Sequence, residues 1–235
     1  MTHFRTDLYL GGDLGSWVLQ QIHPTAIGTV VTPDSDLAAL ARSRDLRVSV
    51  DPPLVHEFDG VTMALSVHYP KILPSQVLGR YRAAYNLHPG YLPWGRGYYP
   101  AFWALLEGTP AGATLHQMTE RLDAGPIVDQ IQVAYSENDT GGSLLQRVRE
   151  AERSLFKHYW PKFTMGEPLP TNPQTGDGSY HSRAAFYAMK RPRDWHTLNA
   201  ETLVKRIRCL TVPGYTGMEL PLGDRIVHFT LQDVA

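Results

Sequence analysis

Short apolar segments alternate with amphipathic helical segments along the first two thirds of the chain, and this alternation constrains the fold more than any other feature. Segments rich in β-branched and apolar residues, each bounded by turn residues, are expected to be strands at 8–10, 26–32, 46–50, 61–67, 83–88, 113–118 and 127–135. Helices are expected between several of them, at 15–22, 35–42 and 101–107, and a further helix with one apolar stripe is expected after the last strand, at 143–163. This alternation predicts an α/β fold with a mostly parallel sheet that is covered by helices.

The composition changes after residue 165. Residues 166–182 are rich in proline and glycine and predict a loop that crosses between two units. Residues 183–235 are expected to form a small α+β module with one helix, which begins after Asn199, and a strand-rich end at 215–229. Such a module is too small to hold a core alone. We therefore expect a catalytic domain at 1–165, a linker at 166–182 and a C-terminal module at 183–235.

Charge and cysteine content limit the classes of partner. The 22 basic and 23 acidic residues of the 235-residue chain leave a formal charge of −1, so no global field attracts nucleic acid or anionic lipid. The sequence contains no run of about 20 apolar residues that would span a membrane. The single cysteine, Cys209, and a first stretch without an apolar signal core predict a cytoplasmic protein. The 10 histidines lack a compact ligand spacing, so no metal is expected.

A glycine-rich stretch, Gly11-Gly12-Asp13-Leu14-Gly15, follows the first predicted strand. Its glycines do not match the G-x-G-x-x-G pattern of dinucleotide-binding sites, and no acidic residue ends the second strand in the expected way. We interpret the glycines as small residues that a tight turn between a strand and a helix requires.

Polar residues with catalytic potential lie at the end of the predicted strand 83–88. Side chains alternate along a strand, so Asn86 and His88 share one face and Leu87 points to the other. Pro89 and Gly90 end the strand, which places an amide donor and a titratable imidazole at its carboxyl edge. Ligands bind at this edge in open α/β sheets. Taken alone, an Asn-x-His pair of this kind is more often a hydrogen-bonded turn than a catalytic pair.

Two further motifs accompany this pair. A loop reading Leu-Pro-Trp-Gly-Arg-Gly follows it at 92–97, and Met-Thr-Glu-Arg-Leu-Asp-Ala-Gly lies at 118–125. In their order and spacing the three motifs resemble the signature of the folate-dependent formyltransferases. The resemblance implies a Rossmann-like, mostly parallel sheet, 10-formyltetrahydrofolate as co-substrate and Asn86, His88 and Asp123 as the catalytic residues.

The resemblance also implies a role for each member of this trio. An amine attacks the formyl carbon, and the amide of Asn86 stabilises the resulting oxyanion, an interaction worth about 3 kcal/mol at acyl-transfer sites. His88 accepts the proton of the amine, since histidine ordinarily titrates near pH ~6.5. Asp123 orients or charge-stabilises His88, or holds a proton-shuttling water. Without the other motifs, Asp123 would be read as an ordinary turn residue before Gly125.

The binding residues follow from the same resemblance. The loops at 66–73 and 119–125 are expected to hold the folate, largely through backbone groups, and the residues expected there are Ser66, His68, Met118, Leu122 and Gly125. The acceptor is expected to contact Tyr69, Lys71, Arg96 and Tyr98. Arg96 and Lys71 have alternative interpretations as a loop-bracing residue and a solvated cation.

The segments at 67–71 and 96–100 resemble the sugar branch of the family, whose members formylate amino sugars linked to dTDP. This implies dTDP-4-amino-4,6-dideoxyglucose as the acceptor, with a homodimer as the expected assembly. Three alternatives stay open: a glycinamide ribonucleotide formyltransferase, a deformylase that hydrolyses the formyl-folate, and a sugar-nucleotide-binding module without turnover.

Overall fold

The computed structural model describes residues 4–52 and 61–232 of the chain. Contacts divide these residues into two compact units that interleave along the sequence. Unit 1 contains the described residues of 1–88, 114–130 and 152–175, and unit 2 contains those of 89–113, 131–151 and 176–235. Each unit is described separately below, and the expected domain boundaries at 165 and 182 remain a prediction.

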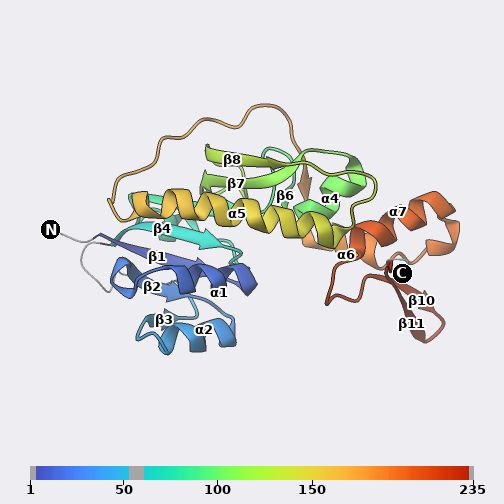
Figure 1. The fold of residues 1–235 in the computed structure, drawn as a ribbon, viewed down its shortest axis with the longest axis horizontal. Coiled ribbons are helices and arrows are strands. Elements are labelled where there is room, and N and C mark those ends of the chain that lie inside the picture. Colours follow the sequence, from blue (N-terminus) through green and yellow to red (C-terminus); the bar gives the residue numbers. More distant parts are fainter. Residues whose placement is uncertain (1–3, 53–60, 233–235) are drawn as a thin grey trace. The chain divides into compact units, whose positions relative to one another are not determined.

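A seven-stranded sheet is the central element of the fold (Figure 1), and its strand order is β3-β2-β1-β4-β5-β7-β8. Its strands are β1 (Arg5–Leu10), β2 (Ile27–Val31), β3 (Arg47–Ser49), β4 (Val61–Val67), β5 (Ala83–His88), β7 (Ala111–Gln117) and β8 (Ile127–Val133). β1, β2, β3, β4 and β5 pair in parallel, and β7 pairs with β5 in the antiparallel direction. The predicted α/β class with a mostly parallel sheet is confirmed.

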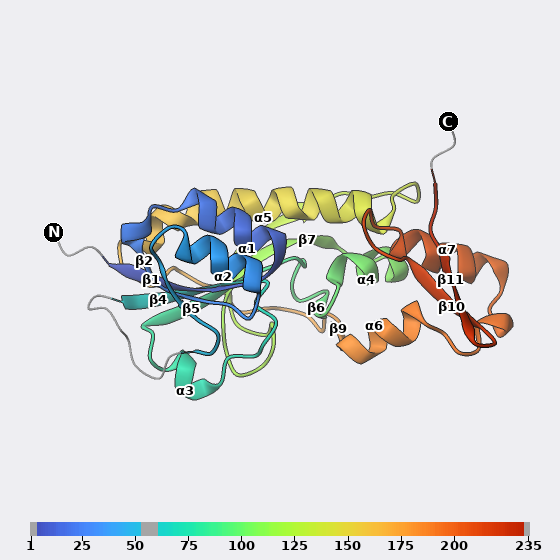
Figure 2. The ribbon, with the colours of Figure 1, turned by 90° about the horizontal axis from the view of Figure 1, so that it is seen from below.

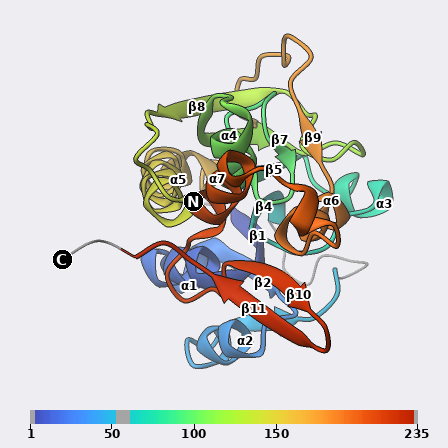
Figure 3. The same cartoon turned by 90° about the vertical axis from the view of Figure 1, so that its right-hand side faces the viewer.

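Helices precede or follow these strands along the chain. α1 (Gly12–Gln21), the 3-10 helix η1 (Pro24–Ala26), α2 (Ser35–Arg42) and α3 (Ser75–Leu78) lie between strands of the sheet, and α5 (Gly141–Phe163) follows β8. Trp17 of α1 meets Phe156 of α5 edge to face, with 5.6 Å between the ring centroids, so α1 and the C-terminal half of α5 cover the same face of the sheet. Figure 3 shows them on one side of the strands and α3 on the other. The short helix α3 was not predicted, because four residues are too few for a periodic apolar pattern.

The glycines after β1 form the expected tight turn. Gly12 has a φ of +60°, in the left-handed region that favours glycine. A Cβ atom on Gly11 would lie 2.3 Å from the carbonyl oxygen of His68, so only glycine allows the end of β1 to approach the end of β4 this closely. This close approach fixes the position of the loop that follows β4.

Unit 2 has a separate apolar core. Its elements are β6 (Arg96–Gly97), α4 (Pro100–Glu107), β9 (Tyr180–His181), α6 (Arg183–Lys190), the 3-10 helix η2 (Trp195–Thr197), α7 (Ala200–Leu210), β10 (Met218–Leu222) and β11 (Arg225–Phe229). Buried residues of α4, α6, α7 and β10 pack together with Leu144 and Val148, and α4 and α7 lie side by side (Figure 2). The C-terminal residues therefore bury their apolar side chains against α4 and the start of α5.

The described C-terminal residues contain one α-helix more than expected, together with the 3-10 helix η2. Asn199 caps α7 as predicted, and its Oδ1 accepts a hydrogen bond from the backbone N–H of Thr202 at 2.8 Å. The expectation of a single helix is wrong, because α6 precedes η2 and α7. Ser182 caps α6 by accepting a hydrogen bond from the N–H of Ala185 at 3.1 Å, and Phe186 is buried in the unit 2 core. The sequence signals for α6 are Ser182 as N-cap, the apolar pair Phe186 and Met189 at helical spacing, and Lys190 in the last turn.

Candidate active site

Strand β5 positions Asn86 and His88 on the sheet face that α5 does not cover. Leu87 points to the opposite face, where it shares an apolar space with Leu65, Leu115 and Phe156. In the register of the sheet, Asn86 lies beside His116 of β7 and beside Ser66 of β4. The side-chain alternation inferred from the sequence therefore holds. Both polar residues belong to the last three residues of β5, and the chain passes from unit 1 to unit 2 directly after His88.

Asp123 approaches these residues from the loop between β7 and β8. Its Oδ2 lies 3.7 Å from Nδ1 of His88, and its Oδ1 lies 3.5 Å from Nδ2 of Asn86. The backbone of Asp123 is in the left-handed region, with a φ of +52°. Aspartate adopts this conformation more readily than most residues, but it still needs restraint from the surrounding structure. The structure thus brings together the three residues that the motifs singled out.

A second histidine, His116, completes the cluster and was missed by the sequence analysis. Its Nε2 lies 3.3 Å from Nδ2 of Asn86 and 3.6 Å from Oδ1 of Asp123, and its Nδ1 lies 3.0 Å from the carbonyl oxygen of Gln117. A hydrogen bond to that carbonyl requires the proton on Nδ1, which leaves Nε2 as an acceptor for the Asn86 amide. The sequence places His116 on the predicted strand 113–118. It does not show that His116 lies beside Asn86, because that depends on the register between β7 and β5.

The cluster is shielded from water. His88, His116 and Asp123 are 4%, 2% and 7% exposed, and Asn86 is half-buried. Charges interact more strongly in such surroundings than in bulk water, because the effective dielectric constant is lower. The arrangement therefore provides an amide donor, an imidazole and a carboxylate that can stabilise a developing oxyanion and move a proton.

The residues expected to bind folate lie around this cluster in unit 1. Ser66 is buried and neighbours Asn86 across the β4–β5 pair, and the N–H of Met118 donates to the carbonyl of Ala84 at 2.7 Å. Leu122 is half-buried and Gly125 is buried, and both belong to the Asp123 loop. The two loops named from the sequence thus flank the ends of β4, β5 and β7.

His68 has a side-chain partner that the sequence did not reveal. Its backbone is in the left-handed region, with a φ of +54°, and its Nε2 lies 2.7 Å from Oε1 of Glu152 on α5. Glu152 is fully buried. The ring of the neighbouring Tyr69 meets Tyr9 edge to face at 5.4 Å, and burial raises the pKa of Tyr69. These contacts fix the start of the loop that follows β4.

Residues expected to bind the acceptor are divided between the units. Lys71, in unit 1, is exposed and its Nζ lies 2.9 Å from Oδ1 of Asp51. Arg96, in unit 2, donates from Nη2 to the carbonyl of Asp177 at 2.8 Å and from Nε to that of Ser179 at 3.4 Å. The N–H of Tyr98 donates to the carbonyl of His181 at 2.9 Å. In this structure the Arg96 side chain therefore connects β6 to the segment at 177–179.

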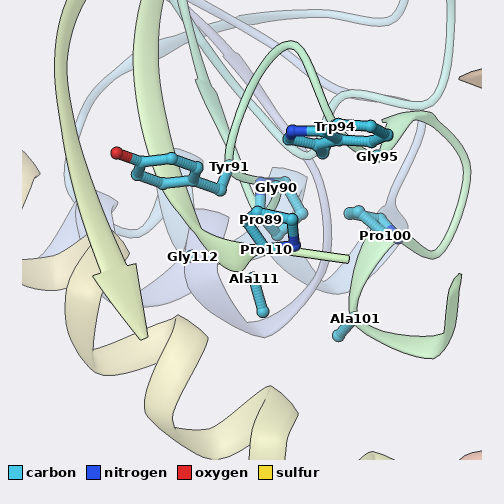
Figure 4. Close-up of a pocket in the computed structure, with 10 residues that line it drawn as sticks. All are labelled: Pro89, Gly90, Tyr91, Trp94, Gly95, Pro100, Ala101, Pro110, Ala111 and Gly112. Carbon is cyan, nitrogen blue, oxygen red and sulfur yellow. The ribbon is translucent and has the colours of Figure 1, made fainter. Parts of the chain in front are cut away.

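Unit 2 contains a small cleft that carries no charged side chain. Figure 4 shows its lining, which comes from Pro89, Gly90, Tyr91, Trp94, Gly95, Pro100, Ala101, Pro110, Ala111 and Gly112. With this lining the cleft offers no cation for a phosphate group.

The described residues offer neither a cluster of metal ligands nor a membrane-spanning helix. Among them, no group of three or more His, Cys, Asp or Glu side chains is arranged to hold a metal ion. None of the helices at 4–52 and 61–232 combines the length and the apolar character needed to cross a bilayer.

The family model for formyl transferases matches residues 38–159, which is more than half of the chain. Similar solved structures include a sugar N-formyltransferase from Shewanella sp., with a TM-score of 0.84 and 20% identity over 99% of this chain and 98% of that one. An N-formyltransferase from Helicobacter canadensis, solved with folinic acid and dTDP-3-aminofucose, has a TM-score of 0.73 and 17% identity over 95% and 85% of the two chains. At 20% and 17% identity, these two structures show that the chain shares their fold.

A third structure is more similar in sequence. The formyltransferase from Anoxybacillus kamchatkensis was solved in complex with UDP-4,6-dideoxy-4-formamido-L-AltNAc and tetrahydrofolate. It is 27% identical to this chain and covers 76% of it, with 86% of its own length matched and a TM-score of 0.52.

Proposed function

The chain belongs to the formyl transferase family, and from this premise we propose that it transfers the formyl group of 10-formyltetrahydrofolate to the amine of a nucleotide-linked amino sugar. The observation that carries the proposal is the cluster at the carboxyl end of β5, in which half-buried Asn86 lies beside the buried side chains of His88 and Asp123. Its amide, imidazole and carboxylate are the groups that amine acylation requires.

The reaction follows from these groups. The lone pair of the sugar amine attacks the formyl carbon, and the carbonyl π electrons move to oxygen, where the N–H of Asn86 stabilises the negative charge. His88 accepts a proton from the new ammonium group, and Asp123 stabilises the imidazolium that forms. The oxyanion then re-forms the carbonyl, the bond to N10 of the folate breaks, and His88 returns the proton to that nitrogen. The products are a formamide and tetrahydrofolate.

The nature of the acceptor is the finer part of the proposal. Support comes from the Anoxybacillus enzyme, which is 27% identical and was solved with a 4-formamido sugar linked to UDP. Further support comes from the motifs at 67–71 and 96–100, which resemble those of enzymes acting on dTDP-linked sugars. We infer that the amine is at position 4 of a dideoxyhexose, with dTDP-4-amino-4,6-dideoxyglucose as the first substrate to test.

The test is a comparison of products by mass spectrometry. The protein is incubated with 10-formyltetrahydrofolate and each member of a panel of dTDP- and UDP-linked amino sugars, with glycinamide ribonucleotide as the control acceptor. The proposal expects a product heavier than the amino sugar by one CO, formed in step with tetrahydrofolate. Formylation of glycinamide ribonucleotide alone, release of formate without an acceptor, or binding of the sugar nucleotide without turnover would instead identify one of the three alternatives.

Lys71 is proposed to meet the phosphates of the sugar nucleotide. Lys71→Ala should raise the KM for the sugar nucleotide about tenfold, the loss of one charge-assisted contact, while the KM for the formyl-folate stays within about twofold. Asp51→Ala is the matched control, because it frees Lys71 from its present partner. We expect the control to keep or lower the KM for the sugar nucleotide. An unchanged constant in Lys71→Ala would place the phosphate site elsewhere.

The homodimer and the cytoplasmic location remain predictions. One feature of unit 2 supports the dimer: β11 is exposed along its whole length and carries Ile226, Val227 and Phe229. Exposed apolar groups of this kind are often covered by a partner.

A further inference from the structure

The segment after α5 runs beside the Asp123 loop within unit 1 and is bound to it. The N–H of Leu169 donates to the hydroxyl of Tyr85 at 2.7 Å. Asn172 and Ile127 form an antiparallel bridge through their main-chain atoms, with N···O distances of 2.7 and 2.8 Å. The proline-rich residues 168–173 thus lie along the start of β8, although they have almost no regular structure.

Gln174 extends from this segment to the backbone of the Asp123 loop. Its Nε2 donates to the carbonyl of Asp123 at 2.8 Å and to that of Gly125 at 2.8 Å. Both partners are acceptors, so the amide nitrogen and not the amide oxygen must face them. The two hydrogens of one amide group therefore connect two carbonyls that lie on either side of Ala124.

This contact restrains the backbone at Asp123, the residue of the loop that faces the cluster. Asp123 is held at a φ of +52°, and its carboxylate lies 3.5 to 3.7 Å from Asn86, His116 and His88. At such separations a small movement of the loop changes which of these groups the carboxylate contacts. The Gln174 amide donates a hydrogen bond to the backbone carbonyl of Asp123, and the side-chain carboxylate of Asp123 faces His88.

We propose that Gln174 is a positioning residue that holds the Asp123 carboxylate in register with His88. The inference rests on the proposed function for the part that Asp123 plays in the reaction. Gln174 acts through the backbone of the loop and does not touch the reacting atoms. Its loss should therefore lower kcat and leave the binding of the sugar nucleotide nearly unchanged.

Two variants and one control test this in the full chain. Gln174→Met has a similar length without the donors, and Gln174→Glu turns carboxyl oxygens toward two carbonyls. We expect kcat to fall about tenfold to a hundredfold in both, the scale of a displaced catalytic group, with the KM for the sugar nucleotide within about twofold. Asn172→Ala is the matched control, because its bridge uses main-chain atoms and its side chain is exposed. It should retain the wild-type kcat. A wild-type kcat in Gln174→Met would overturn the proposal.

A double-mutant cycle separates positioning from general stability. If Gln174 acts through Asp123, Gln174→Met should cause no further loss of kcat in an Asp123→Asn background, because coupled residues are not additive. Independent, multiplicative losses would contradict the proposal.

Amide hydrogen exchange supplies a readout that needs no activity. In Gln174→Met the peptide covering residues 119–125 should exchange at least about tenfold faster, since the loop loses two hydrogen bonds, while peptides from β1 and β4 stay unchanged. Equal exchange in the wild type and the variant would overturn the proposal whatever the substrate is. A wild type without formyl transfer, together with faster loop exchange in the variant, would instead count against the proposed function alone and leave the restraint by Gln174 supported.

Discussion

Gly125, in the Asp123 loop, leaves no room for a side chain. A Cβ atom built on it would lie 1.8 Å from the carbonyl oxygen of Gln117, far inside van der Waals contact. Gln117 also closes the base of the loop, because its N–H donates to the carbonyl of Pro126 at 2.9 Å. The glycine of the Asp-x-Gly motif is therefore required by a close backbone approach that brings Asp123 toward His88.

Gly125→Ala should destabilise the protein by about 1–3 kcal/mol, the range for overpacking in a well-packed region, and should lower formyl transfer. Urea denaturation measures the first effect. Gly79→Ala is the matched control, since its Cβ would meet only the carbonyl of Ser75 at 3.3 Å. Equal stability of Gly125→Ala and the wild type would contradict the requirement for glycine at this position.

The catalytic residues make the second prediction at this scale. His88→Asn and Asn86→Ala should each lower turnover about a hundredfold or more, the scale of a general base or an oxyanion donor. Both variants should still fold, which circular dichroism can verify, because Leu87, the large apolar side chain between the two substituted residues, points to the other face of the sheet. A folded His88→Asn variant with a wild-type rate would exclude His88 from the reaction.

Residue-scale prediction succeeded where side chains follow from local pattern. Alternation along one strand placed Asn86 and His88 on the same face, and the Asp-x-Gly motif marked the loop that carries Asp123. His116 and Gln174 could not be found in this way. His116 approaches Asn86 through the register of β5 with β7, and Gln174 reaches the loop from a segment 49 residues beyond Gly125. Both are long-range contacts that local pattern does not encode.

At the scale of elements, the long apolar periodicities were reliable. The expected helix at 143–163 is α5 at Gly141–Phe163, and the expected strand at 127–135 is β8 at Ile127–Val133. Most of the elements that were missed are short. α3 and the two-residue strands β6 and β9 depend on tertiary contacts, such as the pairing of Arg96 with Tyr180, more than on propensity. α6 is as long as α2, and it was missed beside the proline-rich stretch.

An ion cluster joins α6 to β10 and makes the acid stability of unit 2 predictable. Glu219 is 3% exposed, and Nζ of Lys190 lies 2.8 Å from its Oε1. Arg191 and the hydroxyl of Thr216 also donate to its carboxylate. Burial acts to raise the pKa of Glu219, but these hydrogen bonds outweigh it and lower the pKa to about 2.

A carboxyl group with a lowered pKa stabilises the folded state above its ordinary pKa, and this contribution is lost as the pH falls toward the folded value. The free energy of unfolding should therefore drop between about pH 4.5 and about pH 2, with a share from Glu219 on the order of 3 kcal/mol. Urea denaturation at several pH values measures this share. Glu219→Gln should flatten the decline, and Asp224→Asn, at an exposed turn, should not. An identical pH profile in Glu219→Gln would refute this account.

At the scale of the whole molecule, the two compact units are interleaved along the chain. Composition marks the proline-rich stretch at 166–182, but it cannot show that residues 89–113 and 131–151 pack with the C-terminal residues in unit 2. The apolar faces of α4 and α7 become partners only when the chain folds back over a long sequence distance. The class of fold was therefore predictable, and the grouping of its parts was not.

The central claim is that the cluster on β5 transfers a formyl group from folate to a sugar amine. Its most direct test follows a ¹³C-labelled formyl group by NMR from 10-formyltetrahydrofolate, in the presence of dTDP-4-amino-4,6-dideoxyglucose, with the wild type and with His88→Asn. The account predicts that the label appears in the formamide of the sugar with the wild type, and at least about a hundredfold more slowly with the variant. Label that appears only as free formate, or that reaches the sugar equally fast with both proteins, would contradict it.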